Sequence, residues 1–201
     1  NLLKIDSMPL SPPSKREPVH TRQIECHGYR RDDGLWDIEG HLLDTKPAKP
    51  HATDKTPDDV MVIHDMWLRL TIDDALLVHA AEAVMDKSPY RICPEIAPNF
   101  DTLSGIRIKP GWRQEANRRV GGVKGCTHLV ELLGPMATVC YQTLYGGGPE
   151  ADAEQNRSGD AKRQPTPQSK PHFIDKCHAH RSDGDIVNKY WPEFHINSRK
   201  K

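Results

Sequence analysis

RQIECHGYRRDDGLWDIEGHLLD, residues 22–44, is the stretch of sequence that decides the fold. Two strand-like runs, Arg22 to Tyr29 and Leu35 to Asp44, flank an Asp-Asp-Gly sequence. Asp-Gly is a favoured two-residue hairpin turn, so the stretch predicts a β-hairpin. With Asp33-Gly34 as the loop, Cys26 pairs with His41 across the two strands.

This pairing predicts a polar face and an apolar face, because side chains alternate along a strand. The polar face carries Cys26, Arg30, Asp37, Glu39 and His41. The opposite face carries Tyr29, Trp36, Ile38 and Leu42, which suits a core. Two interpretations of the polar face stand: a solvated surface with cross-strand ion pairs, and one wall of a polar site.

The rest of the chain predicts a second hairpin followed by helices. Apolar residues alternate from Met66 to Ile72, and Asp73-Asp74 separates them from Ala75–Met85. The second arm also fits helical spacing, but a strand gives the shorter connection. Helices are expected at 94–105, 110–120 and 126–145, the last kinked or divided by Pro135. Asp183-Gly184 predicts a terminal hairpin.

Composition limits the classes of protein to consider. A length of 201 residues suits one domain with appended segments. Acidic and basic residues balance at 28 each, which argues against a nucleic-acid partner. No apolar run reaches the roughly 20 residues that span a bilayer, so we expect no membrane insertion. The five widely spaced cysteines indicate a reduced, cytoplasmic protein.

The predicted organisation has four parts. Residues 1–20 form an extended, proline-rich leader, and residues 21–145 form a single α+β domain. Residues 146–170 contain almost nothing to bury and are expected to be a flexible linker. Residues 171–201 form a C-terminal hairpin segment that docks on the domain.

Metal-ligating residue types occur at the ends of three predicted elements. His64 precedes a strand, Cys93 precedes a helix, and Cys126 and His128 stand at the start of the longest helix. Imidazole and thiolate bind zinc and ferrous iron, and a helix amino end favours the thiolate of Cys126. The competing interpretation is a buried structural thiol beside a capping histidine. Cys177, His178 and His180 either reach this site or belong to a solvated tail.

At these residues the sequence resembles the iron–sulfur cluster assembly scaffold family over about residues 58–145. The resemblance implies an antiparallel sheet with helices packed on one face, to which this chain adds N-terminal and C-terminal hairpins. It implies ligands on three loops, in the order of His64, Cys93 and Cys126. His64 stands where that family has a cysteine, and Gly121-Gly122 replaces its proline pair. A mixed histidine and cysteine set suits one metal ion better than a cluster.

The run from Arg30 to His41 also looks like a family of proteobacterial proteins known only as a domain of unknown function. That resemblance covers most of the chain and implies no activity.

The function predicted from the sequence is a metal-dependent enzyme of the lyase or hydrolase type acting on a small organic substrate. One divalent ion, zinc or iron, is held by His64, Cys93, Cys126 and His128. Asp65 orients a ligand or acts as a base, and Asp37, Glu39 or His41 moves protons. The alternatives are a metal or iron–sulfur cluster carrier and a plain binding module. Self-association into a homo-oligomer stays open.

Overall fold

The computed structural model describes residues 10–47, 60–145, 170–171 and 173–196. The chain divides into two compact units, Asn1–Leu144 and Tyr145–Lys201. The first nine residues of the predicted leader, and residues 146–169 of the predicted linker, lie outside the described residues.

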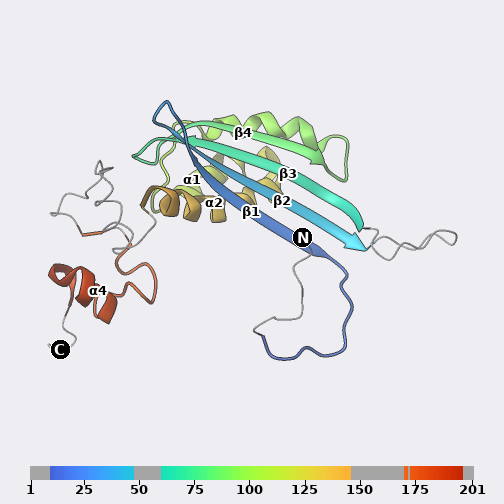
Figure 1. Cartoon of the computed structure of the whole chain (residues 1–201). Coiled ribbons are helices and arrows are strands. Elements are labelled where there is room, and N and C mark those ends of the chain that lie inside the picture. Colours follow the sequence, from blue (N-terminus) through green and yellow to red (C-terminus); the bar gives the residue numbers. More distant parts are fainter. Residues whose placement is uncertain (1–9, 48–59, 146–169, 172, 197–201) are drawn as a thin grey trace. The chain divides into compact units, whose positions relative to one another are not determined.

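The first unit is built on a four-stranded antiparallel sheet with strand order β1-β2-β3-β4, seen side by side in Figure 1. Its strands are β1 (Thr21–Arg30), β2 (Trp36–Pro47), β3 (Val60–Ile72) and β4 (Val78–Lys87). The helical elements that follow are η2 (Cys93–Leu103), α1 (Trp112–Val120), η3 (Gly122–Lys124) and α2 (Thr127–Tyr145). The α+β class and the antiparallel sheet are confirmed, and the first hairpin supplies β1 and β2 of this sheet.

The buried side chains of the sheet project from one face. Along β2 the burial alternates, with Ile38 and Leu42 fully buried and Glu39 and His41 half-buried. These inner residues pack in one cluster with Phe100 and with apolar residues of α1 and α2. Apolar residues at three- and four-residue steps give α2 its buried stripe, and the helix continues through Pro135 without being divided.

The register of the first hairpin differs by one residue from the predicted register. Cys26 lies opposite Gly40, not opposite His41. The loop has three residues rather than two, because Arg31 N donates to Leu35 O at 2.9 Å and Gly34 adopts a φ of 86°. A three-residue loop with a left-handed glycine is the next commonest hairpin connection. The shift moves Cys26 and Arg30 off the polar face.

The second hairpin is confirmed, with β3 and β4 paired in antiparallel register. Its loop is longer than Asp73-Asp74, since the Asp73 carboxylate accepts from the backbone N–H groups of Ala75 and Leu77 at 2.8 and 2.9 Å. Leu76 sits in this loop at a φ of 61°. The strand therefore starts at Val78 rather than at Ala75.

The predicted C-terminal hairpin is wrong. In the described part of residues 170–196, turns lead into the helix α4 (Asp185–Tyr190) and the short η4 (Pro192–Phe194), and there is no strand. Gly184 precedes α4 as its N-cap. The preceding run from Lys176 to Asp183 is polar without apolar alternation, so it gives a strand no partner.

No helix in the described part of the chain is both long and apolar enough to span a membrane.

Two glycines let α2 approach the sheet closely. A Cβ on Gly40 would lie 2.7 Å from Met136 Sδ, and one on Gly28 would lie 2.9 Å from Thr143 Cβ. Real Cβ atoms do not make contacts this short. Glycine at both positions therefore sets the distance between α2 and the first two strands.

We predict that Gly28→Ala lowers the free energy of unfolding by about 1–3 kcal/mol, since the β-branched Thr143 cannot swing away from an added methyl group. Chemical denaturation of the variant measures this loss. The double variant with Thr143→Ala should recover most of the loss, because it removes the clash. Equal stabilities of the single and double variants would contradict the close-approach argument.

Candidate metal centre

Three neighbouring strands place Arg22, Asp44 and His64 in one row. Arg22 pairs with Asp44 across β1 and β2, and Asp44 pairs with His64 across β2 and β3. Asp44 continues the inner face of β2 after Ile38 and Leu42, and it is only 1% exposed. A register shift follows immediately, between Asp44 and Thr45. The row therefore lies at the end of the core, on the side of the sheet that α2 covers.

The Asp44 carboxylate accepts hydrogen bonds on both oxygens. Arg22 binds it through two groups, Nε to Oδ1 at 2.7 Å and Nη2 to Oδ2 at 2.6 Å. His64 Nδ1 lies 2.9 Å from Oδ2, and His20 Nε2 lies 3.2 Å from Oδ1. Hydrogen bonding from Arg22 holds the pKa of Asp44 far below its ordinary value; burial opposes this and His64 adds to it. Asp44 is therefore a buried carboxylate that is ionised at neutral pH.

His128 completes the group from the first turn of α2. Its ring centroid lies 3.8 Å from that of His64, with 32° between the planes. Burial lowers the pKa of His128, and the positive charges of His64 and Arg22 lower it further. One turn along α2, Glu131 forms an ion pair with Arg22 Nη1. The helix is thus connected to the row of strand residues at two points.

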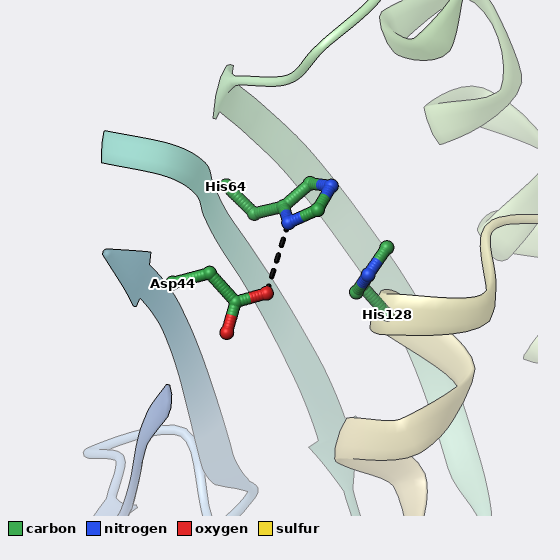
Figure 2. Close-up of side chains that lie close together, drawn as sticks. All are labelled: Asp44, His64 and His128. Carbon is green, nitrogen blue, oxygen red and sulfur yellow. Dashed lines mark hydrogen bonds and ion pairs between the residues drawn. The ribbon is translucent and has the colours of Figure 1, made fainter. Parts of the chain in front are cut away.

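Asp44, His64 and His128 are arranged as a group that is able to hold a metal ion. One ligand atom from each lies within 4.8 Å of the others. The three side chains lie close together in Figure 2. Figure 2 also shows that the carboxylate and the first imidazole come from adjacent strands and the second imidazole from the helix. Two histidines and one carboxylate form the donor set of many iron and zinc sites.

The predicted ligands are brought together only in part. The rings of His64 and His128 contact each other at a tilt of 32°. Cys126 Sγ lies 3.7 Å from His128 Nδ1 and 3.9 Å from Met66 Sδ. Cys93 packs against the hydrophobic core. Neither cysteine belongs to the group of three found among the described residues, in which Asp44 takes the carboxylate position.

Sequence reasoning missed Asp44, although a signal for it exists. Ile38, Gly40 and Leu42 alternate toward the core, and Asp44 is the next residue in that series. A carboxylate at an inward position is costly to bury unless it is paired. Such a position is therefore a candidate site, even at the end of a strand.

The predicted catalytic residues lie on the other face of the sheet. His41 Nε2 bonds Asp65 Oδ1 at 2.8 Å, and its ring stacks on Trp67 with centroids 3.8 Å apart. Asp37 accepts from Thr71 Oγ1 at 2.7 Å. Glu39 accepts from Arg69, which also bonds Glu82. A hollow of about 300 Å³ on this face is lined by Glu39, Trp67, Leu68, Arg69, Glu82 and Val84.

One face of the sheet thus carries Asp37, Glu39, His41 and Asp65. The opposite face carries the candidate metal centre formed by Asp44, His64 and His128. His64 and Asp65 are adjacent in sequence, and successive side chains of a strand point to opposite faces. Asp65 is therefore separated by the sheet from the candidate metal centre.

The other cysteines have different surroundings. Cys140 lies in the core, and burial raises the pKa of its thiol to about 12. Cys26 is half-buried on the inner side of β1, and burial raises its pKa as well. In the second unit, Cys177 Sγ lies 3.2 Å from His180 Nδ1.

Comparison with known proteins identifies the region that contains the candidate centre. A family model described as a protein of unknown function (DUF2889) matches residues 20–142, which include the whole sheet and most of α2. No curated protein and no solved structure matches the chain. The predicted membership of a family of unknown function is confirmed, and the resemblance to the iron–sulfur scaffold stays a prediction.

We predict that Asp44→Asn lowers the free energy of unfolding by about 1–3 kcal/mol at neutral pH, because it removes the buried charged partner of Arg22. The folded-state pKa of Asp44 lies below its ordinary value of 3.8. Its stabilising contribution is therefore fully present above about pH 4 and decreases progressively as the pH falls below that value toward the lower folded-state pKa. Denaturation of both proteins between about pH 7 and about pH 3 should show the difference shrinking.

Asp33→Asn is the matched control for this experiment. Asp33 also pairs with an arginine, Arg31, but both side chains are exposed, and exposed ion pairs contribute little. A loss as large in the control as in Asp44→Asn would contradict a special contribution from the buried carboxylate.

Proposed function

We propose that this protein is a metal-dependent enzyme of the lyase or hydrolase type that acts on a small organic substrate. The chain belongs to the DUF2889 family of proteins of unknown function. In this proposal Asp44, His64 and His128 hold one divalent ion, zinc or iron. The observation that carries the proposal is the convergence of these three side chains from two strands and a helix.

The chemical state of the three groups supports a metal ion. Asp44 stays ionised, and the lowered pKa of His128 keeps its imidazole neutral, which is the form that binds metals. The 2.9 Å between His64 Nδ1 and Asp44 Oδ2 also fits. Two metal bonds of about 2.1 Å at a right angle place their donor atoms about 3.0 Å apart. An ion there would replace the proton that these two atoms now share.

Three protein ligands leave coordination positions for water and substrate, as catalytic sites require. A bound ion would act as a Lewis acid on a carbonyl group or on a water molecule. No redox cofactor motif was found in the sequence, which favours lyase or hydrolase chemistry. Cys126, which contacts His128, would lie beside the ion and limit the room on that side.

The alternative of an iron–sulfur cluster carrier has less support. Clusters are held mainly by thiolates, and the group of three found among the described residues contains no cysteine. A carboxylate and two imidazoles suit a single ion better. We therefore favour the enzyme over the carrier.

We predict that the protein, purified without a tag, contains about one equivalent of zinc or iron. Elemental analysis measures the metal, and a visible absorption band would instead indicate a cluster. His64→Ala and His128→Ala should each lower the metal content at least tenfold, since each removes one of three ligands.

His79→Ala is the matched control. His79 also bonds an aspartate, Asp73, at 3.0 Å, but on the exposed side of the second hairpin. The control should keep its metal. Metal-free wild-type protein that also fails to take up added zinc or ferrous iron would refute the proposed function.

A further inference from the structure

The charges around the candidate metal centre nearly cancel. Asp44 contributes one negative charge, and Arg22 places one positive charge directly on the same carboxylate through two hydrogen bonds. Histidine binds a metal ion as the neutral imidazole, so His64 and His128 add no charge as ligands. Glu131 pairs with the outer end of Arg22, but it is 49% exposed, so water screens its charge. A divalent ion held here would therefore keep nearly all of its double positive charge.

Such a centre attracts a negatively charged ligand to its open positions. Sites with several carboxylates neutralise the ion with protein groups, whereas this site has one carboxylate whose charge a guanidinium already offsets. Because Asp44 is 1% exposed, the interactions at the inner end of the site act in a medium that screens charge poorly. The charge left on the ion would be balanced by the substrate.

Arg22 also has hydrogen-bond donors to spare. A guanidinium carries five N–H groups, and the bonds to Asp44 and Glu131 engage three of them, one each on Nε, Nη1 and Nη2. The side chain is 28% exposed, so it is partly accessible to a ligand. The planar fork of an arginine matches the two oxygens of a carboxylate. His20, 41% exposed and 3.2 Å from Asp44, adds a further donor on the same side.

We propose that the substrate of this centre is a small carboxylate, whose carboxylate group takes the open position on the ion next to Arg22. This inference rests on the proposed function, since it requires a bound divalent ion. It narrows the substrate from any small organic molecule to an organic acid, and it assigns to Arg22 a role in substrate selection.

The test uses the full chain loaded with cobalt(II), whose visible spectrum changes when a ligand enters its coordination sphere. Acetate is the probe, and acetamide, of the same size and without charge, is the control. Acetate should shift the spectrum with saturation, and acetamide should leave it unchanged at the same concentrations. An equal response to both would overturn the inference.

Variants of Arg22 and Glu131 test whether the charge near the ion determines the affinity for acetate. Arg22→Met should weaken acetate binding at least tenfold, whereas Arg22→Lys, which keeps the charge but loses the planar fork, should weaken it by a smaller factor. Glu131→Gln, a change at an exposed side chain, should strengthen acetate binding about two- to threefold, because it removes the competing negative charge. Should Arg22→Met fail to fold, the lysine and glutamine variants still decide the matter, and an unchanged or weaker affinity in Glu131→Gln would overturn the inference.

Different experimental results would refute the proposed metal-dependent function and the proposed carboxylate substrate. A wild-type protein that binds no cobalt would overturn both the proposed function and the carboxylate substrate. A protein that binds cobalt at His64 and His128, as loss of the spectrum in their alanine variants would show, but that does not respond to acetate would overturn the carboxylate substrate alone.

Discussion

A buried carboxylate at the end of the core is the constraint on which the site depends. Asp44 stands where the alternation of β2 would otherwise place an apolar side chain, and a lone charge there would be costly. Arg22 on one neighbouring strand and His64 on the other offset that cost with hydrogen bonds to both of its oxygens. Asp44 can be buried at low cost only when Arg22 and His64 lie opposite it. This row of polar residues therefore favours the observed register of the three strands.

The first two hairpins and the longest helix were predictable, because their signals are local. Alternation and an Asp-Gly sequence specify a hairpin, but they leave open whether its loop has two or three residues. Gly34 settled that choice by adopting a left-handed conformation. The change of one residue in register exchanged the faces of Cys26 and Arg30 while leaving Asp37, Glu39 and His41 together. Alternation therefore predicts which residues of one strand share a face more reliably than it predicts which residues of two paired strands do.

The candidate centre was predicted in part for a similar reason. His64 was predicted to precede a strand but lies within β3, and His128 lies at the start of α2. Their ring centroids are nevertheless 3.8 Å apart. Cys93 stood at the end of an element too, but the start of a 3-10 helix turned it toward the core. Sequence order predicts which elements neighbour one another, whereas the direction of each side chain depends on packing. Asp44 was missed although it continues the inward series of Ile38, Gly40 and Leu42, because an aspartate at the end of a strand is more often exposed.

The sheet finally separates two kinds of polar chemistry that the sequence places side by side. His64 and Asp65 are neighbours in the chain, yet one bonds Asp44 under α2 and the other bonds His41 on the uncovered face. A strand cannot direct adjacent residues to one ion, so a His-Asp dipeptide in a strand indicates two environments rather than one site. On the covered face, Arg22 offsets the only carboxylate among the three ligand groups. In the proposed centre, that balance of charge would leave a bound cation in need of an anionic partner, and it would connect the burial of Asp44 to the choice of substrate.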